Sequence, residues 1–226
     1  MKKTVAFILV VLILAALSGA AFAESGLTVQ NETLIEIEED DSAYFFAKIE
    51  NTGDQAVGIG TGKLVGFSED DDILITEEYL STLPSDLLLE PGEYAYLSEY
   101  VWESELEDAD IAEYRFSVKE DPNADRFESI PCEARYEDEG KYDHYIYVTF
   151  KNETEEVLFD TYITVAMYDT DGNLIYVDGS LEDDIGVHPD STVTIRLYVD
   201  SELTDYYSSQ GIEIGEVDAI VYYTGE

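Results

Sequence analysis

The chain has 226 residues and is poor in cysteine, basic side chains and histidine. It contains one cysteine and two histidines, and its 11 lysines and arginines face 52 aspartates and glutamates. The single cysteine, Cys132, excludes an intrachain disulfide and a metal cluster built from several thiolates. Because Cys132 follows Pro131 in the segment PCEARY, we expect a buried structural thiol rather than a nucleophile.

The shortage of basic residues excludes a further class of function. The formal net charge of −41 at pH 7 repels phosphate backbones and anionic lipids, so we expect no binding to nucleic acid. Since 45% of the residues are apolar and 18 are tyrosines, the acidic side chains indicate a solvated shell over a folded core rather than disorder. Adaptation to high salt, which screens self-repulsion, is a second explanation of the charge.

Catalytic motifs are also missing. His144 precedes an expected strand, and His188 stands before Pro189 in an expected turn. The chain has no Gly-x-Ser-x-Gly elbow, no His-Glu-x-x-His helix and no glycine-rich phosphate loop. With 52 acidic residues, pairs of carboxylates arise by chance, and nothing singles out one pair for hydrolysis. We therefore expect that the protein is not an enzyme.

The first 23 residues have the organisation of a signal peptide. Lys2 and Lys3 form a basic start, residues 5–17 are apolar, and residues 21–23 read Ala-Phe-Ala, a cleavage site. The apolar run is too short for a membrane anchor. We expect residues 24–226 to be secreted, with a net charge of −43 once both lysines are removed. The mature chain would be extracellular or retained at the cell surface, without stable membrane insertion.

The mature sequence contains an internal repeat. The segment YFFAKIEN at residues 44–51 recurs as YIYVTFKN at residues 145–152, an offset of 101 residues. Later matches keep the order but move to an offset of 98, as for Tyr100-Val101 and Tyr198-Val199. Small insertions between matching segments are typical of a duplicated domain. We predict domains at residues 24–121 and 128–226, joined by a polar linker at residues 122–127.

Each copy has the pattern of short strands. Apolar and polar residues alternate in FFAKI, in YIYVTF and in TVTIRLYV, and turn residues such as Asp171-Gly172-Asn173 separate such runs. About 100 residues per copy of this pattern predict an all-β fold of two tandem immunoglobulin-like antiparallel β-sandwich domains. Each domain would contain at most one short helix. Residues 200–211 are the expected helix, with Asp200 or Ser201 at its start and Gly211 at its end.

One short motif resembles a known family. Val165-x-Met167-Tyr168-Asp169 stands before the Asp-Gly hairpin and after a strand that ends at Asn152. Over residues 143–199 this arrangement resembles the FxLYD-type modules of secreted bacterial proteins, with Val in place of Phe and Met in place of Leu. The first copy departs from the motif, since residues 64–68 read Leu-Val-Gly-Phe-Ser. The resemblance implies small immunoglobulin-like β-sandwiches without known catalytic residues.

Aromatic side chains on one strand face are the candidate binding residues. Strand alternation directs Tyr44 and Phe46, and their counterparts Tyr145 and Tyr147, away from the expected core. Exposed aromatic rings can stack on sugars or anchor a protein partner. Two structural alternatives stay open, namely cross-strand packing within the sheet and contact between the two copies.

Lys48 lies on the same outward face as Tyr44 and Phe46. An intramolecular isopeptide bond would need a lysine that points into the core. Its counterpart in the second copy is Thr149, so the copies share no such cross-link. The alternation therefore argues against an isopeptide bond at Lys48.

Acidic runs are candidate ligands for Ca²⁺, and no other cofactor is expected. Residues 169–173, Asp-Thr-Asp-Gly-Asn, resemble the start of a calcium loop, but Met167 stands where an EF-hand register requires an acid. A hairpin turn explains that segment. Other runs could bind Ca²⁺ in a different geometry, although solvated loops are the alternative for each of them. The candidate ligands are Asp70, Asp71, Asp72, Glu182, Asp183 and Asp184.

These observations lead to one functional hypothesis and two alternatives. The leading hypothesis is a non-enzymatic, secreted two-module protein that mediates binding or adhesion in the extracellular medium or at the cell surface. Its partner would be a protein or a glycan. The first alternative is a Ca²⁺- or salt-stabilised structural module of the cell envelope. The second is a hydrolase that uses a pair of carboxylates in a deep cleft.

Overall fold

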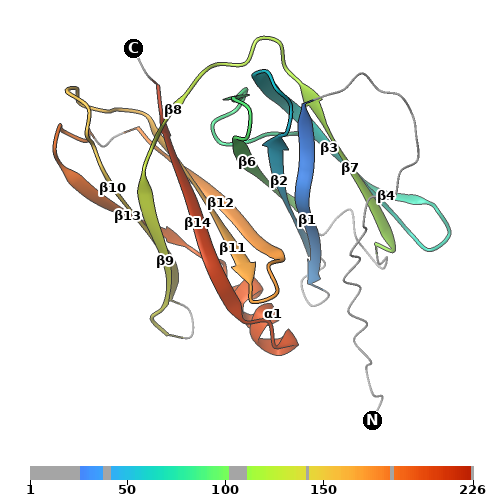
Figure 1. Ribbon diagram of the computed structural model, residues 1–226. Helices are drawn as coiled ribbons and strands as arrows, with labels where there is room; N and C mark the ends of the chain where they lie inside the picture. Colours follow the sequence, from blue (N-terminus) through green and yellow to red (C-terminus); the bar gives the residue numbers. More distant parts are fainter. Residues whose placement is uncertain (1–25, 38–41, 102–110, 141–142, 184–185, 225–226) are drawn as a thin grey trace.

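A computed structural model of the chain describes residues 26–37, 42–101, 111–140, 143–183 and 186–224 (Figure 1). Regular structure in these residues is almost entirely β-strand, and the paired strands are antiparallel. The predicted all-β class is therefore confirmed. The predicted signal peptide and Asp184 lie outside the described residues. No helix in the described ranges is long and apolar enough to cross a membrane.

The first half of the chain forms two sheets that pack face to face, which we call the N-terminal sandwich. One sheet has the order β1-β2-β6, with β1 at Leu27–Ile37, β2 at Ser42–Asn51 and β6 at Tyr94–Val101. In the other sheet β3 (Val57–Phe67) pairs with β4 (Ile73–Leu80), β5 (Leu88–Leu89) and β7 (Glu113–Glu120). The buried core between the sheets includes Phe45, Ala47, Ile49, Ile59 and Leu64.

The second half forms a similar pair of sheets, the C-terminal sandwich. The order β13-β10-β9 combines β9 (Cys132–Asp138), β10 (His144–Lys151) and β13 (Thr192–Tyr198). The order β12-β11-β14-β8 combines β8 (Glu128–Ile130), β11 (Thr161–Asp169), β12 (Leu174–Glu182) and β14 (Ile214–Tyr223). Its core includes Ile146, Val148, Ile163, Val165 and Met167.

Two buried asparagines show why the repeated octets end alike. Asn51 donates from Nδ2 to the carbonyls of Gln55 and Leu89, at 2.8 and 2.9 Å. Asn152 donates in the same way to the carbonyls of Glu156 and Val187, at 2.7 and 2.8 Å. Both asparagines are fully buried, and each holds the chain that leaves its strand against a later segment of its own sandwich. The repeat in the sequence is therefore a repeat of local structure.

The expected helix and hairpin are also confirmed. The helix α1 (Ser201–Gln210) begins after Asp200, whose side chain accepts from the backbone N–H of Glu202, and ends at Gly211 in the left-handed conformation (φ 71°). Leu203 and Tyr207 bury one side of α1 against the C-terminal core. In the β11–β12 hairpin, the Asp169 carboxylate accepts from the backbone N–H groups of residues 171 and 173.

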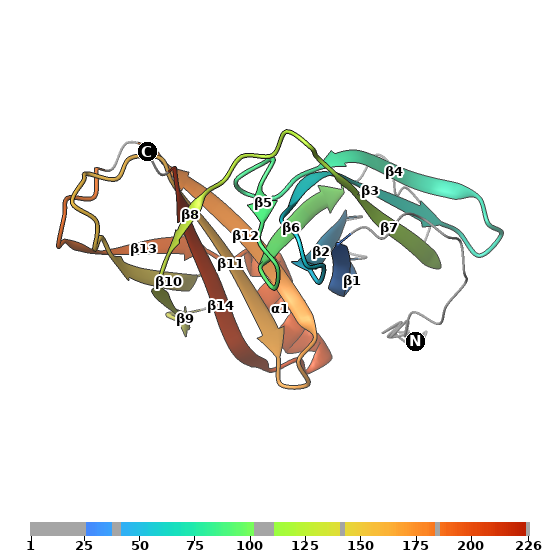
Figure 2. The same cartoon turned by 45° about the horizontal axis from the view of Figure 1, so that its top comes forward.

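The two sandwiches lie side by side, with the outer face of the β1-β2-β6 sheet against the sheet that contains β12 and β11 (Figures 1 and 2). The β1-β2-β6 sheet contacts β12 and β11, and its outward residues join the buried cluster of the C-terminal core. The predicted linker at residues 122–127 falls between β7 and β8. That each sandwich is an independent domain stays a prediction, because their outer faces share buried contacts.

Candidate functional site

Tyr44 and Phe46 do not form an exposed binding surface. They point away from the N-terminal core as the alternation predicted, but they are only 9% and 2% exposed because the C-terminal sandwich covers them. The Phe46 ring lies 5.9 Å from the Tyr176 ring between centroids, and the Tyr44 hydroxyl donates to Asp200 at 3.1 Å. The expectation of exposure was therefore wrong at these two positions. Contact between the copies, an alternative left open by the sequence, accounts for both residues.

Tyr145 and Tyr147 lie on the equivalent face of the C-terminal sandwich, which no described residue covers in the same way. Both are half-buried among their sheet neighbours, and Tyr198 beside them is 47% exposed. Arg196 lies over the Tyr145 ring at 4.3 Å and Arg135 lies over the Tyr147 ring at 4.6 Å. Stacked guanidinium groups keep their N–H edges available for hydrogen bonds. We call this surface, formed by the outward residues of β9, β10 and β13, the open face.

The registers of the two sheets allow the faces to be compared residue by residue. On the covered face, formed by the outward residues of β1, β2 and β6, Phe46 pairs with Ser98 and Thr33, and Tyr44 pairs with Ile35. At the same places the open face pairs Tyr147 with Arg196 and Arg135, and Tyr145 with Glu137. The aromatic pair is therefore common to both faces, but only the open face has charged side chains paired with it.

The tyrosine hydroxyls of the open face are held by acidic residues at its edge. Tyr147 donates to Glu139, and Tyr145 donates to Asp143 at 3.2 Å. The hydrogen bond to Glu139 raises the pKa of the Tyr147 hydroxyl. Arg135 also forms an ion pair with Glu137 at 2.6 Å. The face therefore presents aromatic rings, hydrogen-bond donors and hydrogen-bond acceptors together.

The structure describes five of the six predicted Ca²⁺ ligands, and these five do not form a metal site. Asp70, Asp71 and Asp72 occupy the β3–β4 turn, where the N–H groups of residues 70 and 72 bond to the Ser68 hydroxyl. Glu182 ends β12 and accepts from Ser180 at 2.8 Å, and Asp183 follows it. In the part of the chain that the structure describes, no group of three or more His, Cys, Asp and Glu side chains could hold a metal ion.

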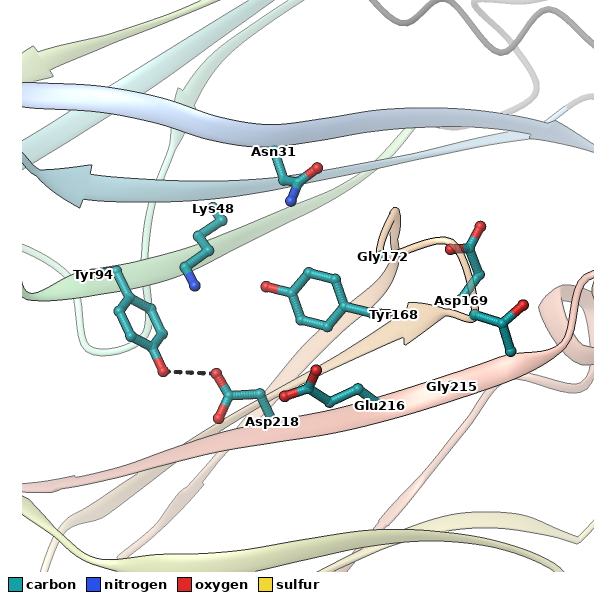
Figure 3. Close-up of a pocket in the computed structure, with 10 residues that line it drawn as sticks. Asn31, Lys48, Tyr94, Tyr168, Asp169, Gly172, Gly215, Glu216 and Asp218 are labelled. Carbon is teal, nitrogen blue, oxygen red and sulfur yellow. Dashed lines mark hydrogen bonds between the residues drawn. The ribbon is translucent and has the colours of Figure 1, made fainter.

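A polar cleft of about 710 Å³ opens where the two sandwiches meet (Figure 3). The N-terminal sandwich contributes Asn31, Lys48 and Tyr94, and the C-terminal sandwich faces them with Tyr168, Asp169, Thr170, Gly172, Gly215, Glu216 and Asp218. The Lys48 ammonium lies 3.7 Å from the centroid of the Tyr94 ring. Lys48 faces outward, as the sequence predicted, and it is half-buried.

Hydrogen bonds between tyrosines and one carboxylate connect the two sandwiches beside this cleft. Asp218 accepts from the hydroxyls of Tyr94 and Tyr96, each at 2.7 Å, and the Tyr96 hydroxyl also bonds to that of Tyr168 at 2.8 Å. Burial raises the pKa of all three tyrosines, and the nearby Asp218 carboxylate adds to the effect. The tyrosines therefore remain protonated donors, and they tie the covered face to β14.

Cys132 is half-buried, and its thiol donates to the carbonyl of Ala219 at 3.3 Å. Burial, aided by Asp218, raises the pKa of the Cys132 thiol to about 11. A thiol with such a pKa is almost entirely protonated at neutral pH, which agrees with a structural role.

The sequence interpretation missed the cleft, because the residues on its two walls are at least 74 positions apart in the sequence. One signal was present. The first copy carries outward tyrosines at residues 94 and 96, where the second copy has Thr192 and Thr194. This difference indicates that the outer faces of the two copies have different environments.

Comparisons with known proteins give no family. No family model and no curated protein sequence matches the chain. Among solved structures, a transglutaminase from red sea bream is similar over 78% of this chain and 27% of its own, with 9% identity and a TM-score of 0.29. The C-terminal globular domain of an oligosaccharyltransferase from Pyrococcus abyssi is similar over 88% and 47%, with 9% identity and a TM-score of 0.24. The chain thus spans about a quarter and about half of these two structures.

Proposed function

We propose that the protein is secreted, is not an enzyme, and binds a neutral glycan at a cell surface through the open face of its C-terminal sandwich. One observation carries the proposal. The duplicated aromatic pair is buried by the neighbouring sandwich in the first copy, whereas in the second copy it stays open and is surrounded by charged residues. A face that kept its rings without a covering sheet is suited to an external partner.

The chemistry of the open face favours a sugar. Tyr145, Tyr147 and Tyr198 offer apolar ring surface, and Arg135, Arg196 and Glu137 offer donors and acceptors to hydroxyl groups. A polyanionic partner is disfavoured because the chain as a whole carries a net charge of −41. An uncharged, hydroxyl-rich glycan avoids this repulsion and still uses both kinds of contact.

The cleft gives little support to the alternative of a carboxylate-dependent hydrolase. Such an enzyme needs two carboxylates that are available to the substrate. Asp218 is occupied by two tyrosine hydroxyls, and Asp169 by the turn of its own hairpin. Glu216 is then the one remaining carboxylate among the cleft residues.

The test compares residues 24–226 with three variants on a panel of neutral glycans and on the envelope of the producing cell. We expect Tyr147→Ala and Tyr198→Ala to weaken binding about tenfold, the usual effect of removing an aromatic anchor. Tyr79→Ala is the matched control, since Tyr79 is 78% exposed on β4 of the other sandwich. It should bind like the unmodified chain.

Two results would overturn the proposal. One is that the unmodified chain binds neither the glycans nor the envelope. The other is that envelope binding is lost after protease treatment and kept after removal of glycans, which would assign a protein as the partner.

A further inference from the structure

The backbone is irregular on both walls of the cleft between the sandwiches. The pairing of β1 with β2 shifts between Val29 and Asn31, and the pairing of β11 with β14 shifts between Tyr168 and Asp169. Such bulges redirect side chains and are frequent beside binding sites. At the second shift stands Gly215, where an added Cβ would lie 2.7 Å from the Asp169 carbonyl oxygen. Only glycine allows this close approach.

The side chains that line the cleft place opposite charges on opposite walls (Figure 3). Lys48 is on the β2 wall, whereas Glu216 and Asp218 are on the β14 wall. Lys48 forms no ion pair with any described carboxylate, although 52 acidic residues are present in the chain. Its ammonium contacts the Tyr94 ring instead. A half-buried lysine in this setting can accept an anionic group from a ligand.

The residues that the N-terminal sandwich contributes to the cleft have no chemical counterparts in the C-terminal sandwich. By register, Asn31, Lys48 and Tyr94 correspond to Glu133, Thr149 and Thr192 in the second copy. No cation, amide or aromatic ring is found at those three positions. The strand arrangement alone therefore does not explain why an amide, a lysine and a tyrosine stand together in the cleft. The aromatic pair of the open face, in contrast, is present in both sandwiches.

The geometry points to a binding site for a small zwitterion, such as a free α-amino acid, in the cleft between the sandwiches. Lys48 and Asn31 bind the ligand carboxylate, and Glu216 binds its ammonium group across the cleft. A ligand with only negative charge would meet the carboxylates of the β14 wall, and one with only positive charge would leave the Lys48 ammonium without an anionic partner. The cleft, of about 710 Å³, is open to solvent and has room for a ligand of this size.

The experiment uses purified residues 24–226 and measures thermal shifts with each common α-amino acid at millimolar concentration. Calorimetric titration then follows for any ligand that raises the melting temperature. For each hit, the matched amine without the carboxylate and the matched acid without the amine are titrated too. We expect the zwitterion to bind and each single-charge analogue to bind at least tenfold more weakly.

Variants assign the site. Lys48→Gln and Glu216→Gln should each weaken binding about tenfold or more, because each removes one charge-assisted contact. Lys63→Gln is the control, since Lys63 is an exposed lysine paired with Glu78 on β3. Urea midpoints check that all variants fold. Binding that survives both cleft substitutions would overturn the assignment, as would a panel in which no amino acid shifts the melting temperature.

The site is separate from the open face, so the two proposals fail independently. Tyr147→Ala should leave amino acid binding unchanged, and Glu216→Gln should leave glycan binding unchanged. Equal binding of the zwitterion, the matched amine and the matched acid would show that the charges of the cleft are not used, and would refute the inference.

Discussion

The repeat supplies a matched pair of substitutions that separates the covered face from the open face. Phe46 and Tyr147 are equivalent residues on equivalent strands, and each lies over the middle of its sheet. Phe46 is 2% exposed against Tyr176, whereas Tyr147 is half-buried and contacts Arg135 and Glu139 at the surface. The two alanine variants should therefore have very different costs, although the sequence context is alike.

The magnitudes follow from burial. Replacing a buried phenylalanine by alanine costs about 3–5 kcal/mol of unfolding free energy, because apolar contacts are lost and a cavity remains. Removing one cross-strand pair on an open sheet face costs roughly 0.2–1 kcal/mol. For a chain of this size each kcal/mol lowers the melting temperature by about 2–4 °C. We expect Phe46→Ala to lower it by roughly 6–20 °C and Tyr147→Ala by no more than roughly 4 °C.

Urea unfolding and thermal melts of residues 24–226, followed by circular dichroism, measure both variants under identical conditions. The urea midpoint gives the difference in stability, and an unchanged slope shows that the same surface is exposed on unfolding. Equal losses for the two variants would refute the reasoning, because they would mean that Phe46 is as open to solvent as Tyr147.

Three further predictions concern stability. Asn51→Ala and Asn152→Ala should each cost about 2–5 kcal/mol of unfolding free energy, because each leaves two backbone carbonyls without their buried donor. Urea titrations in which the costs of the two variants differ by more than about 3 kcal/mol would contradict the structural repeat. Burial raises the pKa of the Asp178 carboxyl, so the folded protein binds this proton more tightly than the unfolded chain. The stability of the unmodified chain relative to Asp178→Asn should therefore improve as the pH falls from neutral toward the ordinary aspartate pKa, and a difference that is constant with pH would exclude this role. Melting temperatures in EDTA and in millimolar CaCl₂ should agree, because the described residues offer no cluster of metal ligands, and a rise with CaCl₂ would restore the calcium alternative.

The parts of the fold that depend on residues close together in the sequence could be predicted. The helix at residues 201–210 is bounded by its own caps, Asp200 and Gly211, and the turn of the β11–β12 hairpin is held by the Asp169 side chain. Strand alternation also assigned Phe45 to the core and Phe46 to the opposite face. These features need no knowledge of distant contacts, which is why local patterns were sufficient.

What covers an outward face could not be predicted in this way. Phe46 is buried by Tyr176, which is 130 residues away and belongs to the other sandwich. Whether two sheet faces pack together depends on the shape and the composition of both. The alternation of apolar and polar residues predicts only the direction in which a side chain points. The informative difference is at the flanking positions, where Ile35 in the first copy corresponds to Glu137 in the second. An apolar flank indicates a covered face, and a charged flank indicates an open one.

Hydroxyl-radical footprinting of the tyrosines, with and without the bound glycan or envelope, tests the central claim most directly. In the free chain we expect oxidation at Tyr147, Tyr198 and the exposed control Tyr79, and protection at Tyr44 and Tyr96. On binding, Tyr147 and Tyr198 should become protected while Tyr79 stays reactive. Oxidation of Tyr44 and Tyr96 in the free chain, or binding that leaves Tyr147 and Tyr198 reactive, would contradict the assignment of one covered face and one open binding face.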